Sequence, residues 1–233
     1  MTKIRTTQDV LLFIPNLIGY ARILAALTSF VVMVVFPEHW ASAILLYIAN
    51  FAGDLVDGIA ARTFHQTSTF GSVLDMVTDR CSTLGLLYVL AGDFGQIDTA
   101  LRVPAFRLLF LFLMLLDISS HWCQMYSSLA VGLHHKSDEG NADRHILVRW
   151  FYKYYWFFGY LCVGAEFTYI ALYALVHMNG STGIFDVAVK VFLAGCIPGC
   201  VAKQAVNVLQ LASACYLIAK TDAENYGKSS KEQ

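Results

Sequence analysis

The sequence predicts an all-α membrane protein, a polytopic bundle of six transmembrane helices preceded by a short interfacial helix at the amino terminus. Of the 233 residues, 57% are hydrophobic and 14% are charged, whereas an average soluble domain holds about 25% charged residues. The hydrophobic residues also form long blocks, and about 20 such residues cross a bilayer core of about 30 Å as a helix. The lipid bilayer is therefore an expected partner. A net charge of −1 gives no reason to expect nucleic acid.

Hydrophobic blocks and the polar turns between them place the helices. Residues 8–16 form the predicted interfacial helix, which we expect to end at Pro15 because proline is tolerated mainly at a helix start or break. The predicted spans are residues 17–36, 40–64, 70–91, 104–133, 150–177 and 184–219, the last of them broken or bent near Pro198. Residues 1–219 would form one membrane domain, and the polar residues 220–233 a disordered cytosolic tail.

Lysine and arginine residues near the helix ends predict the orientation. With six spans, both termini lie on one side of the membrane, together with the second-to-third and fourth-to-fifth connections. That side collects most of these cations, whereas Arg102, Arg107 and Lys190 lie on the opposite side. Positive residues favour the cytosolic side, so we expect the termini and these two connections in the cytosol.

Four aspartates lie where the second span ends and the third begins: Asp54, Asp57, Asp75 and Asp79. An aspartate inside an apolar helix costs about 2.5–3.5 kcal/mol on insertion scales, so such residues usually have a function. Their spacings put each pair on one helix face, and the short link makes the two helices antiparallel neighbours. Carboxylates without accompanying His or Cys suit Mg²⁺ or Mn²⁺. We therefore expect a site for two such ions, bridged by Asp54 and Asp75.

Small residues accompany the carboxylates. Gly58, Ala61 and Gly71 would leave space in which a ligand approaches the backbone. Arg62 follows one turn after Gly58 and suits a bidentate pair with a phosphate. In the alternative interpretation, the aspartates only cap the helices and pair with Arg62 and Arg80. That alternative leaves the spacing of the small residues unexplained.

The pattern D-x2-D-G-x2-A-R-x8-G-x3-D-x3-D, which runs from Asp54 to Asp79 without gaps, resembles the signature of the CDP-alcohol phosphotransferases. Residues 13–22, 74–82 and 119–122 resemble the eukaryotic members of that family that make phosphatidylinositol. The resemblance implies transfer of the phosphatidyl group from CDP-diacylglycerol to myo-inositol with release of CMP. It also implies a homodimer in the endoplasmic reticulum, with the active site facing the cytosol.

The resemblance further implies roles for individual residues. The four aspartates would hold two divalent ions against the diphosphate, and Asp79 would be the general base for the acceptor hydroxyl. Contacts to the CDP-lipid are expected from the polar and small residues around them: Gly58, Ala61, Arg62, Ser68, Gly71, Asn16 and Arg22. An arginine inside an apolar helix is costly, and Arg22 could reach the phosphates from there. The alternative for Arg22 is snorkelling to the lipid headgroups.

The fourth span carries a polar face formed by Asp117, Ser120 and His121. Residues three and four apart are neighbours on a helix, and a polyol acceptor needs several directed donors and acceptors. This face is therefore the candidate wall for inositol, with Arg149 near it. The alternative for His121 is a core histidine with satisfied hydrogen bonds.

Two other functions stay open from the sequence. Another CDP-alcohol phosphotransferase, with glycerol-3-phosphate or serine as acceptor, would share the metal site and differ only in the acceptor pocket. A divalent-cation transporter would place its carboxylates near the bilayer midplane on broken helices, whereas these aspartates lie near helix ends. Arg80 could orient a carboxylate. Glu166 and Lys203 are charges within the last two spans, where they could pair with each other or line a subunit interface.

Overall fold

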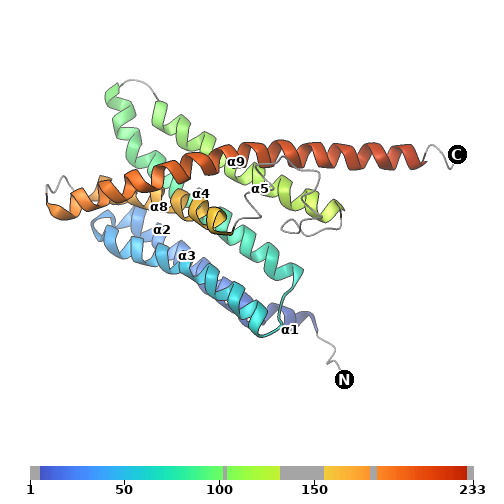
Figure 1. The fold of residues 1–233 in the computed structure, drawn as a ribbon. Helices are drawn as coiled ribbons and strands as arrows, with labels where there is room; N and C mark the ends of the chain where they lie inside the picture. Colours follow the sequence, from blue (N-terminus) through green and yellow to red (C-terminus); the bar gives the residue numbers. More distant parts are fainter. Residues whose placement is uncertain (1–5, 102–103, 132–154, 179–182, 230–233) are drawn as a thin grey trace.

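A computed structural model describes residues 6–101, 104–131, 155–178 and 183–229 and shows a helical chain in which the described residues form no strand (Figure 1). The described residues form the α-helices α1 (Thr7–Leu11), α2 (Ile14–Val35), α3 (Trp40–Thr63), α4 (Thr69–Leu101), α5 (Ala105–Val131), α8 (Tyr155–His177) and α9 (Ile184–Ser229). One turn of 3-10 helix, η1 (Pro37–His39), connects α2 to α3. The predicted all-α class is confirmed.

Five helical segments in the described part of the chain are long and apolar enough to cross a membrane: α2, η1 with α3, α5, α8 and α9. The chain is therefore a helical integral membrane protein. Helix α4 has 33 residues, or about 50 Å at 1.5 Å per residue, but it is less apolar because it carries Asp75, Asp79 and Arg80. The count of six spans stays a prediction.

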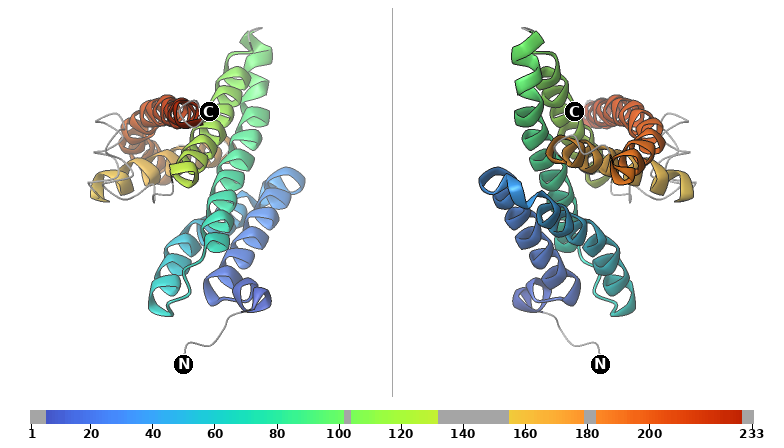
Figure 2. Two further views of the ribbon diagram at one scale, coloured as in Figure 1. Left: turned by 90° about the vertical axis from the view of Figure 1, so that its right-hand side faces the viewer. Right: turned by 90° about the vertical axis from the view of Figure 1, so that its left-hand side faces the viewer.

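Helix α4 is the element that the two halves of the molecule share (Figures 1 and 2). It packs against α2 on one side and against α5 and α8 on the other, while α2 pairs with α3, and α9 packs against both α5 and α8. Figure 2 shows α2 and α3 beside the amino-terminal part of α4 and α5 beside its carboxy-terminal part. The start of α4 therefore lies beside the first two long helices.

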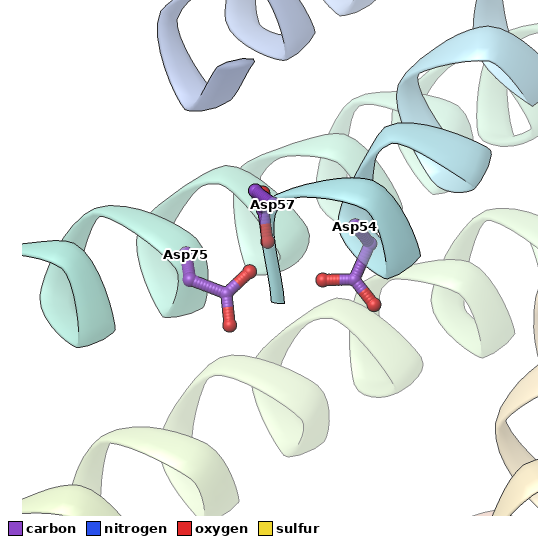
Figure 3. A group of neighbouring side chains, drawn as sticks. All are labelled: Asp54, Asp57 and Asp75. Atoms are coloured by element: carbon purple, nitrogen blue, oxygen red, sulfur yellow. The ribbon is translucent and has the colours of Figure 1, made fainter. Parts of the chain in front are cut away.

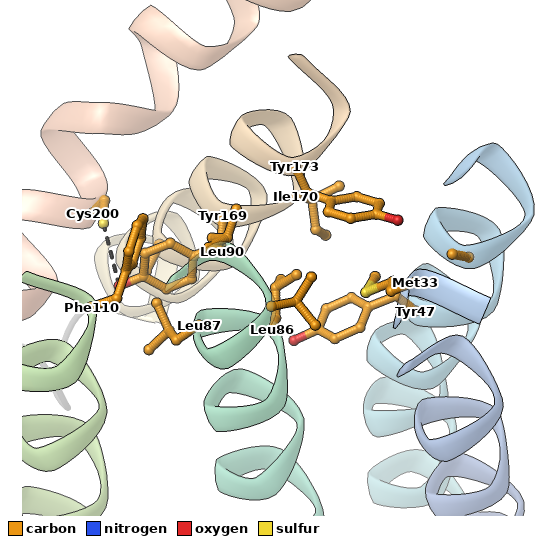
Figure 4. Packing of buried hydrophobic residues seen from close by; sticks show 13 residues of the cluster. Met33, Tyr47, Leu86, Leu87, Leu90, Phe110, Tyr169, Ile170, Tyr173 and Cys200 are labelled. Atoms are coloured by element: carbon orange, nitrogen blue, oxygen red, sulfur yellow. Dashed lines mark hydrogen bonds between the residues drawn. The ribbon is translucent and has the colours of Figure 1, made fainter. Parts of the chain in front are cut away.

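An apolar core holds α4 in this position. Tyr47 of α3, Leu86 of α4 and Tyr173 of α8 are each fully buried, and they belong to one cluster that also contains Phe110 of α5 (Figure 4). The core therefore lies one to three turns beyond Asp79 along α4, so it fixes the helix that carries the site without filling the site.

Replacing Gly85 of α4 by alanine is expected to destabilise the protein. A Cβ atom at Gly85 would lie 2.4 Å from Cζ of Phe30 on α2, and such overpacking costs about 1–3 kcal/mol. Gly92 on the same helix has no atom near its Cβ position, so Gly92→Ala should leave the melting temperature unchanged or raise it, because alanine favours helix by about 1 kcal/mol. Thermal unfolding of both variants in detergent tests this. Equal melting temperatures would contradict the close approach of α2 to α4.

The amino-terminal boundary differs from the prediction. Helix α1 ends at Leu11, and Pro15 lies in the first turn of α2, where proline removes no helical hydrogen bond. The expectation that the short helix ends at Pro15 is therefore wrong. A capping box between Thr6 and Asp9 begins α1, and its interfacial location stays a prediction.

Two helices run further than predicted. Helix α4 continues to Leu101 through the expected loop at 92–103, and α9 continues to Ser229. The prediction of a disordered tail is therefore wrong for residues 220–229, because extending an existing helix avoids the cost of nucleation and this segment holds good helix formers such as Ala, Glu and Lys. Helix α9 passes through Pro198 without a break, although its two parts run in different directions (Figure 1).

Candidate active site

The four aspartates come together where α3 ends and α4 begins. Asp54 and Asp57 are on α3, and Asp75 and Asp79 are on α4. One carboxylate oxygen from each of Asp54, Asp57 and Asp75 lies within 4.8 Å of the others, and Figure 3 shows these side chains coming from the two helices toward one space. An all-carboxylate donor set suits a hard divalent cation such as Mg²⁺ or Mn²⁺. Asp79 is outside this group of three.

Arg22 of α2 contacts all four aspartates. Its Nη1 lies 3.3 Å from Asp54, 2.5 Å from Asp57 and 2.8 Å from Asp75. Its Nη2 pairs with Asp79. Arg22 is only 3% exposed, so the guanidinium is a buried cation shared by the whole cluster. The sequence predicted Arg22 beside the phosphates of a ligand and did not predict these ion pairs.

A pocket opens beside the aspartate cluster. Most of the residues predicted to contact the CDP-lipid line it, together with Asp57 and Asp75: Asn16, Gly58, Ala61, Arg62, Ser68 and Gly71. Arg22 is absent from this lining but pairs with Asp57, which belongs to it. The structure thus collects these residues in one place, and their contacts with the lipid stay a prediction.

Two glycines of the pocket have different surroundings. A Cβ atom at Gly71 would lie 2.9 Å from Oδ1 of Asn16 and 3.1 Å from the hydroxyl of Ser68, which accepts a hydrogen bond from the Gly71 amide. Gly71 therefore permits the close approach of α2 to the start of α4. Gly58 would meet only the tip of Arg62, at 3.7 Å, so it leaves open space in the pocket.

A second polar group extends from Asp79 toward α5. Arg80 lies 3.6 Å from Asp79 and donates to both carboxylate oxygens of Asp117, at 2.9 and 3.2 Å. The same guanidinium lies 3.4 Å from Nε2 of His121. Arg80 therefore connects the predicted base to two of the residues predicted to bind the acceptor.

The other two predicted acceptor residues are placed differently. Ser120 is fully buried and donates to the backbone carbonyl of Asp117 within α5, so its hydroxyl does not lie on the accessible part of this face. The side chains of Asp117 and His121 remain 12% and 18% exposed. Arg149 lies outside the described residues.

The sequence left open whether Glu166 and Lys203 pair with each other or line a subunit interface, and in the structure each has other partners. Lys203 of α9 has its ammonium 3.4 Å from Nε2 of His121 and donates to Asn207. Glu166 of α8 accepts hydrogen bonds from the hydroxyls of Tyr47 and Thr83. Lys203 thus joins the predicted acceptor face, formed by Asp117 and His121, from another helix. Glu166 contacts α4 one turn beyond Asp79. A charged residue inside an apolar span indicates that the residue has a function or a partner. Which residues are its partners depends on how the helices pack.

Comparison with known proteins finds one family. The model of the CDP-alcohol phosphatidyltransferase family matches residues 12–192. A probable CDP-diacylglycerol–inositol 3-phosphatidyltransferase 2 of Arabidopsis thaliana is 38% identical over 231 residues, covering 95% of this chain and 96% of the relative. The CDP-diacylglycerol–inositol 3-phosphatidyltransferases of Saccharomyces cerevisiae and Homo sapiens are 34% and 35% identical, over 97% and 95% of this chain and 94% and 98% of their own. No solved structure matches the chain.

Proposed function

The chain belongs to the CDP-alcohol phosphatidyltransferase family, and we propose that it transfers the phosphatidyl group of CDP-diacylglycerol to myo-inositol, forming phosphatidylinositol and releasing CMP. The observation that carries this proposal is the near full-length similarity to proteins named for that reaction. The cluster of aspartates beside a pocket supports the proposal on chemical grounds, because carboxylates can bind the divalent ions that such a transfer uses.

We propose that the four aspartates hold two divalent ions, Mg²⁺ or Mn²⁺. Their donors are all carboxylate oxygens, and they already share one cation, Arg22, so the residues fit such a group. Bound ions would neutralise the diphosphate and stabilise CMP as a leaving group. Asp54 and Asp75 come from different helices, so together they would hold the ions between α3 and α4.

The acceptor hydroxyl would give its proton to Asp79 as its oxygen forms the new bond to the β-phosphorus, and the bond from that phosphorus to CMP breaks. Arg80 contacts Asp79 and Asp117, so it can orient the base relative to the acceptor. A base positioned in this way contributes about 10²–10⁴ to the rate. Arg62, which lines the pocket, is the side chain proposed to pair with the phosphates of the CDP-lipid.

The placement in the cell follows from the same proposal. We propose that α4 also crosses the membrane and brings the number of spans to six, because it packs between α2 and the pair α5 and α8. The predominance of lysine and arginine on one side supports a cytosolic site, from which CMP can leave. A location in the endoplasmic reticulum and a homodimer are further parts of the proposal that rest on the family resemblance.

The acceptor is tested by incubating purified protein with CDP-diacylglycerol, Mg²⁺ or Mn²⁺, and one labelled alcohol at a time. Labelled lipid is expected with myo-inositol. Labelling by serine or glycerol-3-phosphate instead of inositol would reject the acceptor and leave the family assignment intact. Absence of CMP release with every acceptor would reject the proposed enzyme activity.

Replacing His121 by alanine is expected to raise the KM for myo-inositol by about tenfold. A lost hydrogen bond costs about 0.5–1.5 kcal/mol, and 1.4 kcal/mol corresponds to tenfold in affinity. The KM for CDP-diacylglycerol should stay unchanged, because His121 is absent from the pocket lining. Steady-state kinetics with each substrate varied in turn measure both constants.

Ser119→Ala on the same helix is the matched control, since Ser119 is half-buried and its hydroxyl donates a hydrogen bond to the backbone carbonyl of Leu115 within α5. Equal changes in the two KM values of His121→Ala would show that His121 does not belong to the acceptor face.

A further inference from the structure

We infer that Arg22 competes with the divalent ions for the aspartates and, once they displace it, pairs with the diphosphate of the CDP-lipid. This inference rests on the proposed function and adds a role for one residue of α2. It makes Arg22 the side chain through which metal binding prepares the pocket for an anionic ligand.

The position of Arg22 supports competition. One guanidinium reaches carboxylates on both α3 and α4, including the three whose oxygens lie within 4.8 Å of one another. Those oxygens cannot all bind Arg22 and a metal ion at the same time, because close cations repel each other. Binding of an ion at this group therefore requires the guanidinium to move away.

The charge of the aspartate cluster also supports the binding of metal ions while Arg22 is still in place. Four ionised carboxylates would carry four negative charges, and among the described residues the guanidiniums of Arg22 and Arg80 contact them. These two cations would leave two negative charges uncompensated, so the cluster would still attract divalent cations while Arg22 is present. Arg22 lowers the repulsion among the carboxylates and weakens metal binding without preventing it.

The surroundings of Arg22 identify the group to which it would move. Its Nε is buried and has no hydrogen-bond partner among the described residues, so part of its donor capacity is unused. The pocket is lined by Gly19, one turn before Arg22 on α2, and by its partner Asp57. A guanidinium presents five donors in a planar fork that fits phosphate oxygens. The diphosphate of a CDP-lipid bound in this pocket would have that chemistry.

The backbone of α3 is adapted to this side chain. A Cβ atom at Gly53 would lie 2.7 Å from Cγ and 3.1 Å from Cδ of Arg22. Gly53 therefore gives the aliphatic stem of Arg22 a path along α3, and any larger residue there would displace it.

Two titrations of the purified protein in detergent test the inference. In the first, Mn²⁺ is added without substrate, and binding is followed by the electron paramagnetic resonance of free Mn²⁺. Arg22→Met removes the competing charge, so its Kd for Mn²⁺ should fall by about tenfold or more. In the second, CDP is titrated into protein saturated with Mn²⁺, and the same variant should bind CDP about tenfold more weakly.

Arg22→Lys is the matched control because it keeps the positive charge and loses the fork. Its Kd for Mn²⁺ should stay within about threefold of the wild type, while its affinity for CDP falls. Gly53→Ala is the second variant, for use if Arg22→Met does not fold: it crowds Arg22 away from the aspartates and should also tighten Mn²⁺ binding.

Tighter binding of Mn²⁺ together with weaker binding of CDP by Arg22→Met supports the inference. A damaged fold would weaken the binding of both. Unchanged or weaker Mn²⁺ binding by both Arg22→Met and Gly53→Ala would overturn the competition. Unchanged CDP binding by Arg22→Met would overturn the pairing with the diphosphate. Neither titration contains an acceptor alcohol, so a failure to synthesise phosphatidylinositol would reject the proposed function separately.

Discussion

Asp79→Asn is expected to lower kcat by about a thousandfold, within the range of about 10²–10⁴ for a positioned general base. Asparagine has the size of aspartate but cannot accept a proton from the acceptor hydroxyl. It can still accept a hydrogen bond from Arg22 or Arg80, which contact Asp79, so the cluster should stay assembled. Binding of CDP in the presence of Mn²⁺ should change by no more than about threefold, because Asp79 lies outside the group of three close carboxylates. CMP release and CDP titration measure the two effects.

Asp93→Asn is the matched control for this substitution. Asp93 is on the same helix, and its carboxylate lies 3.1 Å from Nε2 of His177 on α8. The core residues Leu86 to Leu90 lie between it and the aspartate cluster along α4. We expect turnover close to that of the wild type. Substantial activity of Asp79→Asn would show that another group takes the proton.

Removal of divalent ions is expected to abolish CMP release, to about 1% or less of the starting rate, because the ions supply the charge that stabilises the leaving group. Excess EDTA tests this, and added Mg²⁺ or Mn²⁺ should restore activity. The fold should survive chelation, because Arg22 pairs with all four aspartates when no metal ion is bound. Circular dichroism should therefore show unchanged helix content in EDTA.

Zinc is the control ion for this experiment. It is usually bound through Cys or His, and the close group contains only Asp54, Asp57 and Asp75, so Zn²⁺ should restore less activity than Mg²⁺. Full activity in EDTA would exclude a metal-dependent transfer.

Local spacing predicted the aspartate half of the site. The faces of the two helices follow from separations of three and four residues, and the short link between Thr63 and Thr69 brings them together. Most of the expected CDP-lipid residues therefore line one pocket. The ion pairs of Arg22 could not be predicted in this way, since they join residues more than 30 positions apart and depend on how α2 packs against α3 and α4.

The predicted helix boundaries are wrong where tertiary contacts supply hydrogen-bond or ion-pair partners to polar residues. Gly92 and Asp93 suggested a loop, yet α4 continues past them, because Asp93 has a partner in His177 of α8. The same reason limits what the sequence shows about Lys203 and Glu166. Each is recognisable as a buried charge, but its neighbours come from helices whose relative positions no local pattern specifies.

The order of the helices along the chain affects how the site is assembled during synthesis. The aspartate cluster and its pocket use residues between Pro15 and Asp79, whereas the acceptor face needs α5 and α9. A ribosome adds about 5–20 residues per second, so the first part exists for seconds before Lys203 is made. Arg22 precedes all four aspartates in the chain. Each carboxylate is therefore synthesised after the arginine with which it pairs.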